Sequence, residues 1–285
     1  MNNLTIQRYL KFLNPVRVCQ NIKWRYSAQK SDLNHVFIVG IPRSGTSLIF
    51  SIIRAHPAFS SIDNETYFFV PRDIFNQNYK NFYGNQFIDY QTLVTLRNQS
   101  YDLVDFYDKL TQFILTKENK QRFIEKTPKH LFYLKYLVEH YPNAKFINMI
   151  RDGRDCYLSH KKLESYLHKN VDDFAHFWQN GIALREKLND NSQIIDIKYE
   201  QLTKHPWQIM SRVMEFIGEQ FYPQQIETHA YSKTSLSNIQ GHDRLKRPIE
   251  FVSANTWQQK MNIQEINIFN KIAGQTLEKL GYSVS

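Results

Sequence analysis

The sequence has only two cysteines, Cys19 and Cys156, and they form no CxxC pair. The histidines show no spacing typical of a metal site. The sequence therefore predicts no zinc centre, and its two cysteines predict no disulfide framework. Long apolar runs are also missing, and residues 1–26 contain no stretch of the length that a signal peptide or a membrane span needs. These absences favour a cytoplasmic protein with reduced thiols and no membrane span.

The charge is unbalanced toward basic residues, with 36 Lys and Arg against 27 Asp and Glu and a formal net charge of +9. Such a field attracts anions of any kind, from nucleic acid to a small phosphate-bearing ligand. A nucleic-acid binder is the non-catalytic alternative, and it would show a continuous basic stripe and steep salt dependence. The sequence contains no dense Lys/Arg block, so we expect no nucleic-acid partner.

Residues 36–50, "VFIVGIPRSGTSLIF", resemble a phosphate-binding loop that lacks its lysine. Gly40 and Gly45 are five residues apart, as in the Walker A pattern, but Thr46 stands at the lysine position. The nearby positive charge is Arg43, inside the loop. A glycine next to a helix N-terminus lets backbone N–H groups approach an anion, so the loop predicts a phosphate site without the kinase lysine.

Short apolar segments alternate with helical ones along most of the chain, which predicts an α/β fold: a P-loop-like central parallel sheet with helices on both faces. We expect one domain over residues 31–285, preceded by a helical N-terminal extension, residues 1–30. Strands are expected at residues 35–40, 60–63, 121–125, 145–150 and 193–199. Helices are expected near residues 46–55, 128–140, 172–189, 206–218 and 263–280, with a further helix beginning near Gly153, and irregular structure is expected over 231–258.

Three charged residues follow successive expected strands. Glu65 comes after the second strand, Lys126 after the third and Arg151 after the fourth. Ligands of open parallel sheets bind at the carboxyl ends of the strands, where the loop 41–47 also lies. Each residue alone has a structural explanation, as a surface carboxylate, a helix-capping lysine or a salt-bridged arginine. Asp152, beside Arg151, is expected to cap the next helix rather than to hold a metal.

The segments "VGIPRSGTSLI", "NETYFF", "EKTPKH", "INMIRDGRDCYLSH" and "IKYEQL" together resemble the sulfotransferase family, closest in pattern to the tyrosylprotein sulfotransferases and their bacterial relatives. The resemblance implies the donor 3′-phosphoadenosine-5′-phosphosulfate (PAPS), its product 3′-phosphoadenosine-5′-phosphate (PAP), and no required metal. The implied donor-binding residues are Arg43, Ser44, Gly45, Thr46 and Ser47 for the 5′-phosphosulfate, Arg151 and Ser159 for the 3′-phosphate, Tyr199 near the adenosine, and Ser235, Ser237 and Arg247 in a closing segment.

The same resemblance implies the catalytic groups. Glu65 would be the general base that accepts the proton of the acceptor hydroxyl, and Lys126 would stabilise charge on the leaving phosphate oxygen. His130 and His160 are alternative bases, because cytosolic relatives use a histidine. Trp257 and Lys260 resemble a closing pair of the family, although Trp257 fits a core position equally well.

The acceptor is where the sequence departs from the tyrosylprotein enzymes. Those enzymes have a membrane anchor, flanking cysteines and an arginine at the position of Tyr67. We therefore expect a small-molecule acceptor presenting a hydroxyl, with an amine left open, in secondary metabolism. Peptide tyrosine sulfation is the alternative, and an ATP-dependent P-loop kinase is a further one; a homodimer also stays open. Acceptor selection is expected from the aromatic residues Tyr67, Phe68, Phe69, Phe82 and Tyr83.

Overall fold

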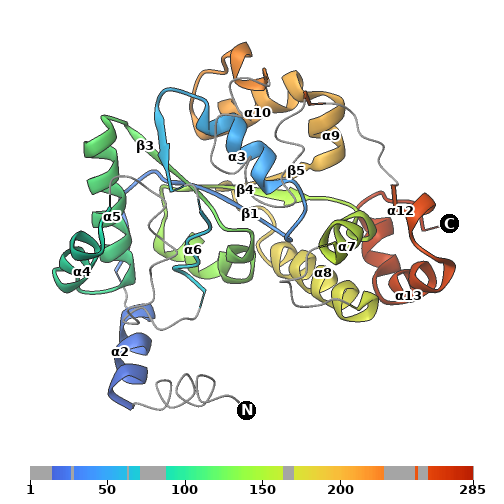
Figure 1. The fold of residues 1–285 in the computed structure, drawn as a ribbon, viewed down its shortest axis with the longest axis horizontal. Helices are drawn as coiled ribbons and strands as arrows, with labels where there is room; N and C mark the ends of the chain where they lie inside the picture. The colour runs from blue at the N-terminus through green and yellow to red at the C-terminus, as the bar shows by residue number, and fades with distance from the viewer. Residues whose placement is uncertain are drawn as a thin grey trace.

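The computed structural model describes residues 15–26, 29–62, 64–70, 88–162, 170–227, 248–249 and 256–284. A parallel five-stranded sheet in the order β2-β3-β1-β4-β5 forms its centre (Figure 1). The strands are β1 (Val36–Gly40), β2 (Phe59–Ser61), β3 (Arg122–Lys126), β4 (Lys145–Ile150) and β5 (Ile194–Lys198). The α/β parallel-sheet prediction is confirmed.

Helices cover both faces of the sheet (Figure 1). The helices are α2 (Pro15–Arg25), α3 (Thr46–Arg54), α4 (Tyr90–Asn98), α5 (Leu103–Glu118), η2 (Pro128–Tyr133), α6 (Leu134–His140), α7 (Gly153–Lys161), α8 (Val171–Glu186), α9 (Tyr199–Lys204), α10 (Pro206–Ile217), η3 (Pro223–Ile226), α12 (Thr256–Lys260) and α13 (Ile263–Lys279). Among these described residues, no helix has the length and apolar character needed to cross a membrane.

The side-chain alternation of β1 explains the two-faced core. Val36 and Ile38 point to one face and pack with apolar residues of α3 and α10. Phe37 and Val39 point to the other face, toward α5, α8 and α13. All four side chains are fully buried, as expected for a parallel strand covered on both sides.

The structure differs from the expected elements in a few places. The segment after Thr127 begins as the 3-10 helix η2 and becomes α-helical only at Leu134. β5 ends at Lys198, and α9 follows it directly without having been expected. α12 begins within the stretch 231–258 that was expected to be irregular. These elements are five or six residues long, too short for a clear helical period.

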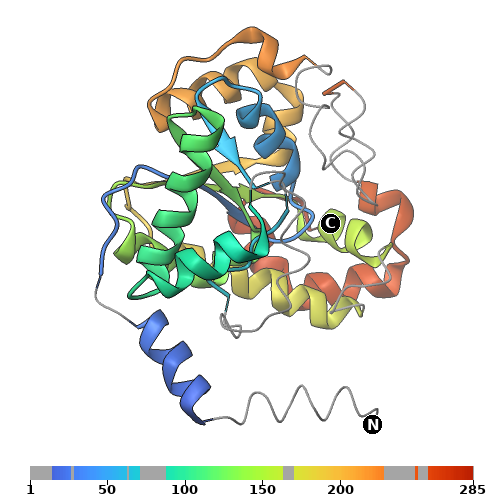
Figure 2. The ribbon, with the colours of Figure 1, turned by 60° about the vertical axis from the view of Figure 1, so that its left-hand side comes forward.

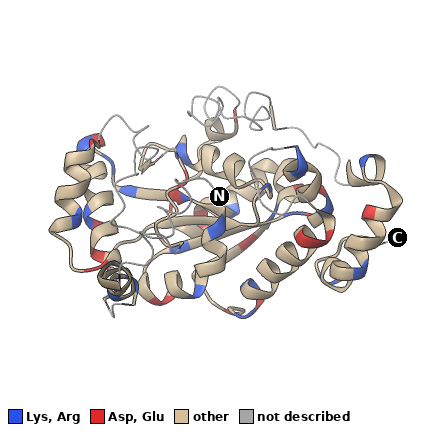
Figure 3. Ribbon diagram, turned by 60° about the horizontal axis from the view of Figure 1, so that its bottom comes forward, with Lys and Arg blue, Asp and Glu red and all other residues tan. Residues whose placement is uncertain are grey.

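α2 places part of the N-terminal segment in a helix that stands off from the sheet and its covering helices (Figure 2). The division into an extension of residues 1–30 and one domain over 31–285 stays a prediction. Lys and Arg positions are interspersed with Asp and Glu positions along the ribbon of the described helices in Figure 3.

Candidate functional site

The loop between β1 and α3 contains three residues with positive φ. They are Gly40 at 151°, Arg43 at 76° and Gly45 at 99°. A Cβ atom at Gly45 would lie 2.3 Å from Cδ2 of Tyr199, which is closer than any real contact. The loop therefore requires glycine at position 45 on both conformational and steric grounds. For Arg43, the left-handed conformation is uncommon and typical of a functional loop.

The interior of this loop has the chemistry of an anion site. α3 begins at Thr46, and its N-cap, Gly45, has no side chain with which to bond the first N–H groups. The side chain of Ser44 is 1% exposed, and its Oγ has no hydrogen-bond partner among the described residues. A helix N-terminus carries partial positive charge, so an anion seated here would receive N–H and hydroxyl donors together.

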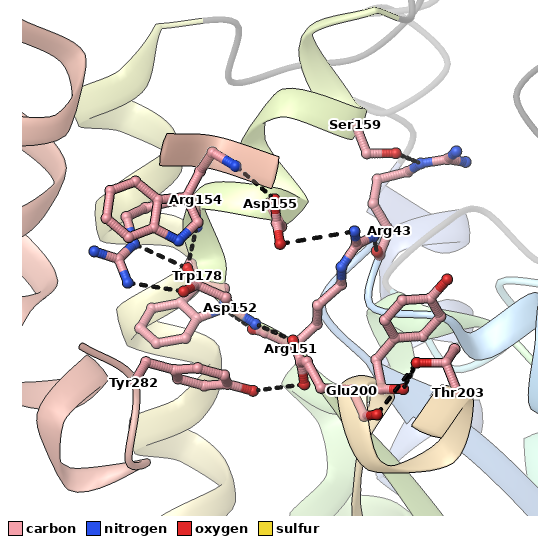
Figure 4. Close-up of polar contacts among 12 residues, drawn as sticks. Arg43, Arg151, Asp152, Arg154, Asp155, Ser159, Trp178, Glu200, Thr203 and Tyr282 are labelled. Atoms are coloured by element: carbon pink, nitrogen blue, oxygen red, sulfur yellow. Dashed lines mark hydrogen bonds and ion pairs between the residues drawn. The ribbon is translucent and has the colours of Figure 1, made fainter. Parts of the chain in front are cut away.

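Arg151, directly after β4, joins this loop (Figure 4). Its Nη1 donates to the backbone oxygen of Arg43 at 3.2 Å, and its guanidinium carbon lies 4.5 Å from the centre of the Tyr199 ring. Its Nε is buried and without a partner within the described ranges. Arg43 Nε donates to Ser159 Oγ at 2.9 Å. The structure thus brings together four of the residues expected to bind the donor.

The remaining residues of the "RDGRD" segment have structural roles that the sequence analysis assigned only in part. Asp152 caps α7 by accepting from Arg154 N at 2.9 Å, which confirms its expected capping role. The Arg154 side chain is fully buried, bonds to both Asp152 oxygens and lies 3.6 Å from the Trp257 ring centre. Asp155 accepts from Trp257 N at 3.0 Å. Trp257 is 3% exposed and packs in the core, whereas Lys260 is exposed.

A second group of charges lies at the end of β3. Lys126 is the last residue of this strand, and its side chain is 2% exposed. Its Nζ lies 3.3 Å from Oε1 of Glu65, whose side chain is 25% exposed. The hydroxyl of Tyr67 donates to the other oxygen, Oε2. Tyr67 has a φ of 52°, a strained value for a bulky residue, which turns its ring back toward Glu65.

The residues flanking Lys126 hold the residues that follow Glu65. Thr127 Oγ1 accepts from the backbone N–H of Thr66 at 2.9 Å. Glu125 Oε1 accepts from both hydroxyls, at 2.9 Å from Thr66 and at 2.6 Å from Thr127. These hydrogen bonds hold the segment of Glu65, the candidate base, against the end of β3, the strand that carries Lys126. No local sequence pattern predicts this role for Glu125, because Thr66 is 59 positions away in the chain.

Burial controls the protonation of the groups beneath this pair. Glu125 is 1% exposed, and burial raises its pKa to about 7, against the lowering effect of the bonds from Thr127 and Thr66. His130 Nδ1 lies 3.7 Å from Glu125 Oε1, and burial lowers the pKa of His130 to about 3. His130 and His160, the alternative bases, are 0% and 3% exposed. The greater exposure of Glu65 favours it as the group that meets an acceptor.

The aromatic residues expected to select an acceptor divide into two kinds. Phe68 and Phe69 are 3% and 2% exposed and lie in the core, with ring contacts to Tyr107 from α5. Their side chains therefore pack the domain, and Tyr67 is the residue of this segment beside the charged pair. The other predicted site residues that lie outside the described residues are Phe82, Tyr83, Ser235, Ser237 and Arg247.

The family model described as the sulfotransferase family matches residues 35–223, which include both groups of charges. The chain belongs to the sulfotransferase family. It is 24% identical to protein-tyrosine sulfotransferase 1 of Danio rerio over 285 residues, covering 94% of this chain and 77% of that protein. It is also 24% identical over 281 residues to the nodulation protein NoeE of Sinorhizobium fredii, covering 87% and 66%.

Solved structures confirm the fold. The sulfotransferase domain of the Synechococcus olefin synthase aligns with a TM-score of 0.60 at 16% identity, covering 90% of this chain and 99% of that domain. A mouse sulfotransferase, SULT7A1, solved in complex with PAP, aligns with a TM-score of 0.52 at 12% identity, covering 92% and 91%. At these identities the likeness shows a shared fold alone. The ligands of this sulfotransferase must be inferred from its own residues.

Proposed function

We propose that this sulfotransferase moves the sulfuryl group of PAPS to a hydroxyl of a small-molecule acceptor, an amine being the other acceptor atom to test. The observation that carries the proposal is the pair of Glu65 and Lys126 at the carboxyl end of β3. Lys126 lies opposite Ile38 of β1 in the sheet, and the anion loop begins two residues after that position. An acid–base pair and an anion cradle therefore lie at one edge of the sheet.

The residues of the loop fit PAPS. A 3′-phosphorylated nucleotide with a 5′-phosphosulfate needs anion donors at two places and a flat surface for its base. Within the part of the chain that the structure describes, the loop offers the buried hydroxyl of Ser44 without a hydrogen-bond partner. The end of the neighbouring strand β4 offers the Nε of Arg151, likewise without a partner among these residues. Tyr199 supplies an aromatic face beside Arg151. The residues proposed to hold the donor are Arg43, Ser44, Gly45, Thr46, Ser47, Arg151, Ser159 and Tyr199.

The donor, when bound, supplies an electrophilic sulfur and a phosphate leaving group. Glu65 is exposed enough to accept the proton of an acceptor hydroxyl, a role worth about 10²–10⁴-fold in rate. Lys126 is buried beside it, so its ammonium group meets developing negative charge in a site of low dielectric constant. The bonds that Thr66 donates to Thr127 and Glu125 hold the residue after Glu65 against the end of β3, which reduces the reorganisation needed before reaction.

A phenolic acceptor is the second candidate, and one contact favours it. The Tyr67 hydroxyl donates to Glu65, so the surroundings of the base already accommodate a phenol. The relatives named as protein-tyrosine sulfotransferases keep peptide tyrosine open as the source of that phenol. An acidic peptide would need a cation beside the base to hold its carboxylates, and this chain has Tyr67 where the tyrosylprotein enzymes are expected to have arginine.

We expect the purified chain with ³⁵S-labelled PAPS to transfer label to a small hydroxylated compound in preference to an acidic tyrosine peptide. The panel contains phenols, aliphatic alcohols, amines and the peptide. Tyr67→Arg should shift the preference toward the peptide by about tenfold, because a charged hydrogen bond to a peptide carboxylate is worth about 1.5–3 kcal/mol. Tyr67→Phe, which keeps the ring, is the matched control and should leave the order of acceptors unchanged.

Two results would count against this assignment of the acceptor. Label entering only the peptide with the unaltered chain would replace the small-molecule acceptor by peptide tyrosine. Label entering an amine alone would retain the sulfotransferase reaction and change the acceptor atom. The kinase alternative predicts binding of ATP with Mg²⁺ in place of PAP.

A further inference from the structure

The net positive charge of the chain lies largely in its N-terminal segment, because that segment contains no acidic residue. Residues 1–31 contain six Lys and Arg and no Asp or Glu, whereas the formal charge of the whole chain is only +9. The six residues are Arg8, Lys11, Arg17, Lys23, Arg25 and Lys30. Like charges gathered in one segment attract an anionic surface far more strongly than the same charges dispersed over a domain.

α2 lies within this segment and carries an exposed apolar stripe. Val18, Ile22 and Tyr26 follow one another at intervals of four residues, a spacing that places residues on the same face of a helix. Their side chains are 39%, 52% and 79% exposed. Val16, nearby, is 64% exposed. Tyr26 N donates a hydrogen bond to Ile22 O, so the helical hydrogen-bond pattern of α2 continues to Tyr26. Three exposed apolar side chains on one short helix, with Tyr26 directly after it, predict an interaction surface.

The other side of α2 attaches it to the domain. The Trp24 ring lies 6.1 Å from that of Phe106 of α5, centre to centre. Arg25 Nη1 donates to the backbone oxygen of Phe68 at 3.1 Å, three residues after Glu65. α2 is therefore bonded to the same segment that carries the candidate base, while Val18 and Ile22 of α2 stay exposed. Figures 1 and 2 both show α2 standing off from the rest of the fold.

We propose that α2, in a segment whose sequence is basic throughout, is a docking surface for an anionic lipid bilayer. A protruding helix with an apolar stripe and basic residues lies in the interface plane of a membrane, its apolar side chains among the headgroups. Each Lys or Arg near an anionic leaflet strengthens binding about fivefold. A single convex helix with no acidic residue suits a lipid surface better than a folded acidic partner, which would need a shaped groove on this chain.

Docking through α2 would place the segment of Glu65 close to the membrane surface, because Arg25 joins the two. An amphiphilic acceptor, with its apolar tail in the bilayer and its hydroxyl at the interface, then becomes the expected substrate class. This consequence rests on the proposed sulfotransferase activity. The docking itself does not, because it depends only on the described residues of α2 and on the charge of the N-terminal segment.

Vesicle co-sedimentation of the full chain tests the proposal. We expect binding to vesicles of phosphatidylcholine mixed with phosphatidylglycerol, little binding to phosphatidylcholine alone, and weakening by salt. Ile22→Asp should reduce the partition coefficient at least about tenfold, because an apolar side chain is lost and a repelled charge is gained. Lys23→Gln should reduce it about fivefold. Ile263→Asp and Lys260→Gln on the opposite end of the chain are matched controls, and Ile263 is 67% exposed.

Absence of binding to the anionic vesicles by the folded chain would overturn the proposal. So would equal effects of Ile22→Asp and Ile263→Asp, because the stripe would then contribute nothing specific. Titration of PAP on the same preparations separates this failure from a failure of the proposed reaction. A chain that binds PAP but no vesicle is a sulfotransferase without a docking helix, and a chain that binds vesicles but no PAP retains only the lipid surface.

Discussion

Glu65→Gln should lower kcat by about 10²–10⁴-fold, the range typical for loss of a general base, while PAP affinity changes by less than about twofold. Glutamine keeps the size of the side chain and still accepts a hydrogen bond from Tyr67, but it takes no proton from an acceptor. Glu65 lies beside Lys126 and not in the loop after β1. Its replacement should therefore slow the chemical step and leave binding of the donor nucleotide nearly unchanged. The measurement is single-turnover transfer of ³⁵S at saturating donor.

Glu139→Gln is the matched control for that variant. Glu139 is also a carboxylate paired with a lysine, Lys135 at 3.8 Å, but its side chain is 55% exposed and lies on α6. We expect no change in its single-turnover rate. A Glu65→Gln enzyme that turned over like the unaltered chain would remove Glu65 from the reaction and return attention to other bases.

Glu125→Gln should change the dependence of stability on pH between about pH 4.5 and pH 7. Burial raises the folded-state pKa of Glu125 from an ordinary 4.5 to about 7. The proton is therefore held more tightly in the folded state, and the associated stability is fully present below pH 4.5 and lost as pH rises through 7. At about 1.4 kcal/mol per pKa unit this amounts to roughly 3 kcal/mol.

Glutamine does not titrate, so the free energy of unfolding of Glu125→Gln relative to the unaltered chain should rise by roughly 3 kcal/mol between pH 4.5 and pH 7. Urea unfolding at several pH values measures this difference. His130 acts in the opposite sense: burial lowers its pKa to about 3, so its contribution is present above pH 6.5 and lost as pH falls toward 3. The comparison between variant and parent removes that background to first order.

Glu215→Gln, at an exposed carboxylate of α10, is the control for Glu125→Gln and should run parallel to the parent at every pH. A parallel curve for Glu125→Gln itself would show that Glu125 has an ordinary pKa in the folded chain. Because Glu125 bonds Thr66 and Thr127, its protonation should also loosen the segment of Glu65.

The parts of the fold that the sequence predicted are those with a local signal. A few consecutive residues were enough to predict the strand at 36–40, the loop with the glycines that follows it, and the apolar strand at 145–150. Asp152 was predicted as a cap because it is a preferred N-cap residue placed directly before a helix. Ligands of parallel sheets bind at the carboxyl ends of the strands, and Glu65, Lys126 and Arg151 each follow an expected strand. They were therefore predicted to lie at one edge of the sheet before any contact was known.

The parts that were missed depend on contacts between distant segments. Glu125 is held by Thr66 and by Tyr107, whose hydroxyl lies 3.3 Å from Oε2, and neither neighbour is visible from the local sequence. Phe68 and Phe69 were expected to meet an acceptor, but tertiary packing against α5 places them in the core. Aromatic composition alone could not separate a core residue from a pocket residue.

Calorimetric titration of PAP without metal tests the central claim, that the loop after β1 holds a 3′-phosphorylated nucleotide, most directly. The variants are Gly45→Ala and Gly218→Ala. Both glycines have positive φ, but a Cβ at Gly45 meets the Tyr199 ring at 2.3 Å, whereas one at Gly218 meets nothing within 4 Å. Gly218→Ala therefore reports the backbone strain alone, about 1–2 kcal/mol of stability, without any change at the loop.

We predict that the parent and Gly218→Ala bind PAP without metal, and that Gly45→Ala loses more than about tenfold in affinity, as expected for a clash costing 1–3 kcal/mol. ATP with Mg²⁺, titrated in parallel, should bind more weakly to the parent than PAP does. Binding of ATP with Mg²⁺ in place of PAP, or equal PAP affinity in the Gly45→Ala and Gly218→Ala chains, would contradict the account.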